Sequence, residues 1–107
     1  MMTIWQEIEN KMNANPEPIQ NENVRYEFHL SGENEEKKQL VLANGNASVE
    51  EAGTAEPNCI LKMTASDFEK LVRGELKATS AFMFGKLKIE GSMGYALKLE
   101  KILSEYQ

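Results

Sequence analysis

The stretch Ser80–Leu103, SAFMFGKLKIEGSMGYALKLEKIL, carries two apolar periods that decide how the end of the chain folds. In its segment KLKIEG, Leu87 and Ile89 alternate with charged residues, which is the period of a half-buried strand. After Gly91 the apolar residues recur every three or four positions and cover a wide face, which predicts a terminal helix. We therefore expect a short apolar turn of helix at Ala81–Phe84, then a strand, a glycine break and a helix.

Upstream of this stretch, alternating apolar residues predict four more strands. The first of them alternates apolar with polar residues, which is typical of an antiparallel strand with one wet face. The pair Asn44 and Gly45 suits the two positive-φ positions of a type I′ hairpin, so the strands on either side of it should pair. We expect the four strands at Val24–Leu30, Lys37–Ala43, Asn46–Glu50 and Cys59–Met63.

Two further helices flank these strands. Thr3–Ala14 has apolar residues at helical spacing, and Thr3 is suited to cap its first turn. Ser66 and Glu69 have the spacing of a capping box, which predicts that a second helix begins with Ser66 as its cap. Trp5 is expected to anchor the first helix on the sheet rather than to stack on a ligand.

Residue types that carry catalysis are sparse. His29 is the only histidine and falls on the polar face of its strand, with no nucleophile or orienting partner signalled in the sequence, so we expect a solvated side chain. Cys59 is expected to be a core residue, and a single cysteine excludes an internal disulfide and a cysteine-based zinc site within one chain. We therefore expect a protein that is not an enzyme and that uses no metal or cofactor.

Length and charge narrow the class further. A chain of 107 residues is expected to form one domain, 1–107, around a single core. A net charge of −5 argues against nucleic acid as a partner and against a purely electrostatic hold on anionic membranes. The sequence has no apolar run of the ~18 residues that an integral membrane segment needs, although transient membrane contact stays compatible with it. The acidic start of the chain is unlike an export signal, so we expect a cytoplasmic location.

The C-terminal stretch also resembles a known family. Its succession of SAF, a glycine, KLKIEG, SMG and an apolar helix is similar to the C-terminal signature of the sterol carrier protein type 2 (SCP-2) family. The matching residues are Ser80, Ala81, Phe82, Gly85, Lys86, Leu87, Lys88, Ile89, Gly91, Met93, Gly94, Ala96 and Leu99. The resemblance implies an α+β fold in which helices cover one face of a five-stranded, mainly antiparallel sheet.

The same resemblance implies a function. Members of this family hold fatty acyl chains, acyl-coenzyme A or sterols in an apolar tunnel between sheet and helices, so we expect non-enzymatic binding and transfer of such lipids. Fraying of the terminal helix is the expected route by which the lipid enters and leaves. The ligand-binding residues that the resemblance implies are Phe68, Leu71, Val72, Phe82, Met83, Phe84, Leu87, Ile89, Met93, Leu97 and Leu103.

Other interpretations of the apolar surface stay open. The helices could fill a solid core, or their apolar face could bind another chain, as a protein-interaction or dimerisation module that is a monomer or weak dimer. A third interpretation is an accessory domain that presents lipid to a separate enzyme. No basic cluster in the sequence favours acyl-coenzyme A over other lipids, and the ending SEYQ lacks the tripeptide of peroxisomal relatives.

Overall fold

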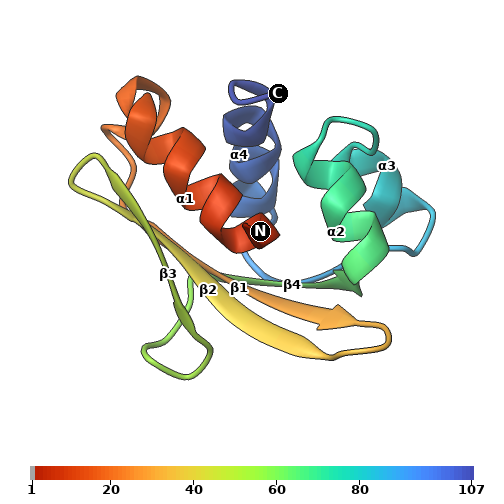
Figure 1. Cartoon of the computed structure of the whole chain (residues 1–107). Helices are drawn as coiled ribbons and strands as arrows, with labels where there is room; N and C mark the ends of the chain where they lie inside the picture. The colour runs from red at the N-terminus through yellow and green to blue at the C-terminus, as the bar shows by residue number, and fades with distance from the viewer. Residues whose placement is uncertain (1) are drawn as a thin grey trace.

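Alternating burial along the strands builds one apolar sheet face, and all the helices pack on it (Figure 1). The computed structural model describes residues 2–107. Its strands are β1 (Val24–Ser31), β2 (Glu36–Ala43), β3 (Asn46–Glu51), β4 (Cys59–Thr64) and β5 (Lys88–Gly91). Its helices are α1 (Ile4–Ala14), α2 (Ala65–Val72), α3 (Ala78–Met83) and α4 (Met93–Ser104), with a short 3-10 turn at Glu17–Ile19. The predicted α+β fold is confirmed.

The strand β1 lies at the centre of the sheet, whose order is β3-β2-β1-β4-β5. It pairs antiparallel with β2 and parallel with β4, and both edge strands pair antiparallel with their neighbours. The register places Tyr26 beside Leu40 on one side and Cys59 on the other, and all three side chains are buried. The sheet is therefore mainly antiparallel, as expected, with one parallel pair.

Several local predictions are confirmed. Asn44 and Gly45 have φ values of 54° and 75°, so the hairpin between β2 and β3 turns where the sequence indicates. Thr3 caps α1, and its hydroxyl accepts a hydrogen bond from the backbone N–H of Gln6. Cys59 is buried in the core, and burial raises the pKa of its thiol.

The start of α2 differs from the prediction. Thr64, the last residue of β4, caps the helix, and its hydroxyl accepts a hydrogen bond from the backbone N–H of Asp67 at 3.0 Å. The capping box predicted at Ser66 and Glu69 was wrong because Thr64 caps equally well. The pairing of β4 with β1 extends to Thr64 and sets the point at which the chain leaves the sheet.

Trp5 joins two helices to the sheet. Its ring stacks on that of Phe68 in α2, with centroids 4.8 Å apart, and its centroid lies 5.7 Å from that of Phe28 on β1. Its indole N–H donates a hydrogen bond to Glu36 at 2.9 Å. Trp5 therefore anchors α1 on the sheet, as the sequence predicts.

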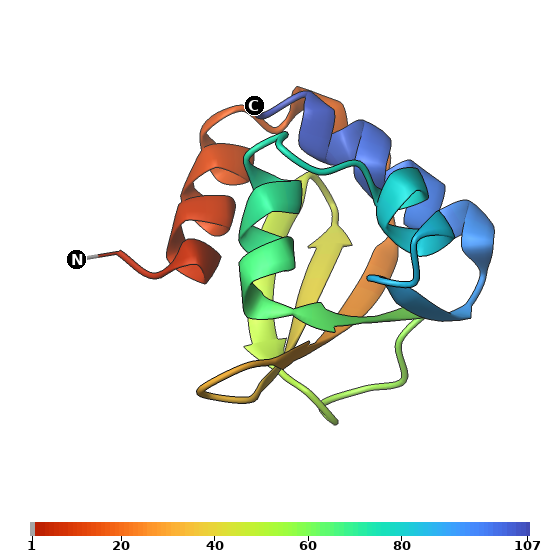
Figure 2. The same cartoon turned by 90° about the vertical axis from the view of Figure 1, so that its right-hand side faces the viewer.

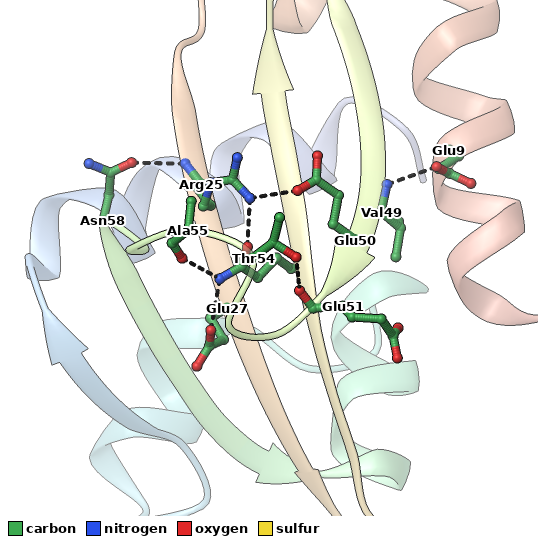
Figure 3. Close-up of polar contacts among 10 residues, drawn as sticks. Glu9, Arg25, Glu27, Val49, Glu50, Glu51, Thr54, Ala55 and Asn58 are labelled. Carbon is green, nitrogen blue, oxygen red and sulfur yellow. Dashed lines mark hydrogen bonds and ion pairs between the residues drawn. The ribbon is translucent and has the colours of Figure 1, made fainter.

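The sheet face opposite the helices carries a polar network (Figure 3). Gln39 is fully buried and donates hydrogen bonds to Glu27 and to the carbonyl of Ala55, each at 2.8 Å. His29 is half-buried and lies 2.6 Å from the Glu27 carboxylate. The side chain that was expected to be solvated is therefore only partly so, because the His29 ring is held against the Glu27 carboxylate.

Glu27 is ionised in this network against the effect of its own burial. Burial disfavours the carboxylate, but hydrogen bonds from His29 and Gln39 outweigh it and hold the pKa of Glu27 below its ordinary value of 4.5. A carboxylate whose pKa folding lowers stabilises the fold at pH values above its unfolded pKa. That contribution disappears as the pH falls through the lowered folded pKa.

We predict that Glu27→Gln lowers the free energy of unfolding at pH 7 by roughly 1 kcal/mol, because it removes the charge from two hydrogen bonds. The deficit relative to the unchanged protein should shrink as the pH falls below the ordinary glutamate pKa of 4.5. Urea unfolding at a series of pH values measures both effects, with the exposed Glu56→Gln as control. A deficit that is the same at all pH values would contradict the conclusion that the Glu27 charge stabilises the fold.

Candidate functional site

The eleven predicted ligand-binding residues fall into three groups by exposure. Four of them are buried in the core: Phe68, Leu71, Leu87 and Leu103. Two are half-buried: Val72 and Ile89. Five are exposed to solvent: Phe82, Met83, Phe84, Met93 and Leu97. The structure therefore does not gather all eleven around one space.

The buried part of the predicted site is occupied by neighbouring side chains. Phe68 packs between Trp5 and Phe28, and the ring centroids of Phe68 and Phe28 lie 5.0 Å apart. These three rings fill the layer between β1 and the helices α1 and α2. The sheet side of the site is thus a packed core, and the open space lies elsewhere.

A pocket of about 330 Å³ lies where α2, α3 and α4 meet, and it opens to solvent. Its apolar lining consists of Leu71, Leu76, Leu97 and Leu103. Lys77, Thr79 and Glu100 are among the polar residues at its rim, and no strand contributes to it. The pocket therefore includes three of the predicted residues but sits between helices, at the outer surface of the helical layer.

The helix α3, which borders this pocket, is buried through small side chains only. Ala78 and Ala81 are each 3% exposed, whereas Phe82 is 43% and Met83 is 82% exposed. The usual arrangement places large apolar side chains inside, because burying them gains more free energy. In α3 this arrangement is inverted, so the helix presents its largest apolar groups to solvent.

The attachment of α3 to the rest of the helical layer is also slight. The two helices α3 and α4 lie side by side (Figure 2), and α3 is on the side of α4 away from α1. Their side-chain hydrogen bond runs from the hydroxyl of Thr79 to Glu100 at 3.4 Å, at an exposed position. A short helix with so little buried apolar surface is the kind of element that opens at low cost in free energy.

The terminal helix α4, in contrast, is held at both ends. The buried hydroxyl of Tyr26 donates a hydrogen bond to the carbonyl of Tyr95 in its first turn at 2.7 Å. Just beyond its last turn, the hydroxyl of Tyr106 donates to the carbonyl of Asn15 at 2.7 Å. Burial raises the pKa of Tyr26, so this phenol keeps its proton. These contacts favour α3, rather than α4, as the element that moves.

The histidine and the cysteine of the chain both lie away from the pocket. His29 and its partner Glu27 lie on the opposite sheet face, and the buried Cys59 has a raised thiol pKa that keeps it protonated. Residues 2–107 contain no group of His, Cys, Asp and Glu side chains placed to hold a metal ion. Over the same residues, no helix has the length and apolar character to cross a membrane.

Sequence reasoning missed part of the pocket. Leu76 continues the apolar spacing of α2 in the sequence, and this periodicity could have indicated that Leu76 lines the pocket. In the structure α2 ends at Val72, and Leu76 lies beyond the helix. The polar rim residues Thr79 and Glu100 carry no such signal. They meet because two helices that are separate in the sequence pack side by side.

Comparison with curated proteins finds relatives with a longer chain. The protein is 44% identical over 96 residues to hydroxysteroid dehydrogenase-like protein 2 of Xenopus tropicalis, covering 86% of this chain and 22% of the relative. It is 43% identical over 84 residues to the human protein of the same name, covering 75% of this chain and 19% of the relative. The chain therefore spans about a fifth of the length of these relatives.

Comparison with solved structures finds the same fold. Sterol carrier protein 2 from Yarrowia lipolytica, in its apo form, matches with a TM-score of 0.78 and 26% identity, over 97% of this chain and 89% of that one. The sterol carrier protein domain 2 of Helicoverpa armigera matches with a TM-score of 0.81 and 27% identity, over 96% and 84% of the two chains. The model of the SCP-2 sterol transfer family matches residues 6–104. The chain belongs to the SCP-2 sterol transfer family.

Proposed function

We propose that the protein binds a single hydrophobic lipid, a fatty acid, an acyl-coenzyme A or a sterol-like molecule, and transfers it without catalysing a reaction. The observation that carries this proposal is the inverted burial of α3 beside an apolar pocket. Large apolar side chains on a helix that is poorly anchored are stabilised when an apolar ligand covers them. Membership of the SCP-2 family supports a lipid as that ligand.

The proposed route of entry follows from the unequal attachment of the helices. Outward movement of α3 breaks the exposed contact between Thr79 and Glu100 and deepens the pocket towards the core. The lipid then contacts Leu71 and Leu103 at the floor, which already line the pocket. Phe82, Met83, Phe84, Met93 and Leu97 turn onto it from above, so that the eleven predicted residues form the binding wall only in the bound state.

Magnitudes are consistent with reversible binding. An acyl chain of about fourteen methylenes gains roughly 11 kcal/mol on burial, at about 0.8 kcal/mol per methylene. Association costs several kcal/mol, which leaves an affinity in the micromolar range or somewhat tighter. The pocket of about 330 Å³ is at the small end of the range for ligand sites and is open on one side, so enclosing a chain calls for movement of α3.

A second candidate function rests on the relatives. The chain spans 22% of hydroxysteroid dehydrogenase-like protein 2 from Xenopus tropicalis, so its counterpart there is one part of a longer protein. The same pocket would then present a lipid to a separate catalytic unit instead of carrying it between membranes. Both functions use the same binding step, and transfer from donor to acceptor vesicles in the absence of any enzyme distinguishes them.

We predict that Leu97→Asp weakens fatty acid binding at least tenfold, because the bound chain would desolvate the new carboxylate. Leu97 is 46% exposed in the free protein, so the substitution should leave the fold intact. Displacement of a fluorescent fatty acid measures the affinity, and Leu97→Met is the matched control that keeps an apolar side chain. Equal affinities for Leu97→Asp and the unchanged protein would remove Leu97 from the site.

We also predict that the backbone amides of α3 exchange with solvent faster than those of α4, and that added fatty acid slows exchange in α3. The physical reason is that α3 buries only Ala78 and Ala81, whereas α4 buries four side chains: Ala96, Leu99, Ile102 and Leu103. Hydrogen exchange followed by mass spectrometry reports both helices in one experiment. Fatty acid that protects α4 and leaves α3 unchanged would instead support entry by fraying of the terminal helix.

A further inference from the structure

Exposed apolar side chains are concentrated at one place on this protein. Among residues 2–107, five of the six large apolar side chains that are exposed belong to the segment from Phe82 to Leu97, and the other is Met2. Three of the five are consecutive, at Phe82, Met83 and Phe84, and we call these three residues the tip. Met83 and Phe84 are 82% and 79% exposed, which is more than the 60% of Met2, the next most exposed of the six.

The backbone that carries the tip is ordered by hydrogen bonds. The amides of Lys86 and Leu87 both donate to the carbonyl of Ala81, at 2.8 and 3.1 Å. Gly85 has a φ of +74°, and a Cβ built on it would meet nothing within 4 Å. The tip is therefore the end of α3 and its C-cap residue Phe84, held in a defined turn that leads into β5, with Met83 and Phe84 exposed to solvent.

Positive charge is concentrated around the tip, in a chain that is acidic as a whole. Residues 76–99 contain four lysines and one glutamate, a net charge of +3, whereas the whole chain carries −5, so the other residues carry −8. Two of these charges are paired with residues outside the segment: Glu90 with Lys62 of β4, and Lys98 with Glu22. No ion pair joins Lys86 or Lys88 to any of residues 2–107.

The sheet edge next to the tip extends this basic surface. Gly85, Lys86 and Lys88 border an open depression that is also lined by Lys37, Lys62 and His29. The acidic residues along it are Glu35 and Glu36, and Glu36 already accepts the hydrogen bond of the Trp5 indole. Basic side chains from β2, β4 and the start of β5 thus come together beside three exposed apolar side chains.

We propose that the tip inserts into the interface of an anionic membrane, while Lys86 and Lys88 contact its phosphate headgroups. An apolar wedge flanked by lysines is the combination that lipid interfaces bind, since the apolar groups enter the acyl boundary and the lysines meet negative charge. The charge of −8 on the remaining residues is repelled by the same surface, so it orients the molecule with the tip towards the membrane.

Charge also argues against a second copy of this chain as the occupant of the tip. A two-fold dimer would bring the same patch of both copies together and would place Lys86 and Lys88 against their own counterparts. Like charges across an interface oppose association. An anionic lipid surface can contact both the apolar side chains of the tip and the lysines beside them.

Membrane docking extends the proposed function. Its biological role depends on the proposed lipid transfer, but the binding to a membrane does not. Insertion gives Phe82 and Met83 an apolar environment outside the protein, which holds α3 away from α4 and turns the pocket towards the bilayer. A lipid could then pass between membrane and pocket without crossing water. Binding to the membrane itself is measurable whether or not the pocket takes a lipid.

The test is co-sedimentation of the full chain with two kinds of vesicle, pure phosphatidylcholine and phosphatidylcholine with roughly one third phosphatidylglycerol. We expect binding to the anionic vesicles that is at least tenfold stronger than to the neutral ones and that weakens with added salt. The double variant Met83→Ser with Phe84→Ser and the double variant Lys86→Glu with Lys88→Glu should each lose at least tenfold in binding. Matched controls on and before α1, Lys11→Glu and Met2→Ser, should stay within about twofold of the unchanged protein.

The outcomes separate this proposal from the proposed function. Absence of binding to anionic vesicles, equal binding to both kinds of vesicle, or unchanged binding by the tip variants would each overturn docking. A further outcome would also overturn docking: the protein forms dimers in gel filtration, the double variant Met83→Ser with Phe84→Ser is a monomer, and no vesicle binding is seen. The tip would then bind a second copy of the chain. Fatty acid displacement without vesicles should be unaffected by Lys86→Glu with Lys88→Glu. Vesicle binding by a protein that takes up no fatty acid would support docking while the lipid-carrying function fails.

Discussion

The apolar face of β1 and its two neighbours is the constraint on which the rest of this structure depends. The register places Tyr26, Leu40 and Cys59 side by side, and each helix is placed by what it can bury on that face. α1 and α2 contribute large groups, through Trp5 and Phe68, and close the layer between them with stacked rings. In α3, by contrast, only two alanines are buried, and its neighbour in the helical layer is α4.

The unequal anchoring of the helices gives the fold a rigid part and a loose part. Tyr26 and Tyr106 tie the two ends of α4 to the sheet and to the end of α1, through buried or long-range hydrogen bonds to backbone carbonyls. Among residues 2–107, α3 has no comparable tie, and its side-chain hydrogen bond to α4 is exposed. In the proposed function, α3 is the element that moves to admit a large apolar molecule, while the other helices hold the pocket in shape.

Charge is distributed unevenly along the chain. The whole-chain charge of −5 argues against a purely electrostatic hold on anionic membranes, yet residues 76–99, which contain the tip, carry +3. Repulsion of the acidic remainder and attraction of the tip act together, because both depend on the same surface potential. The polar network around Glu27 and Gln39 lies on the other sheet face, away from the helices.

Much of the fold was predictable because its signals are local. The alternation in KLKIEG, the hairpin at Asn44 and Gly45 and the apolar spacing of the terminal helix each depend on neighbouring residues, so each appears in the structure where the sequence indicates. The cap of α2 was misplaced because Thr64 and Ser66 are chemically equivalent as caps, and the strand pairing chose between them. The parallel pairing of β1 with β4 depends on contacts between distant segments.

The sequence by itself determined most of the secondary structure, the family and the apolar character of the candidate site. Only the tertiary structure decided which of those apolar residues face inward, because the side that a short helix buries depends on the space its neighbours leave. In α3 that space admits Ala78 and Ala81, and Phe82 and Met83 are therefore left outside. The basic edge beside them has the same origin, since pairing of β5 with β4 brings Lys88 opposite Lys62, across a gap of twenty-five residues in the chain.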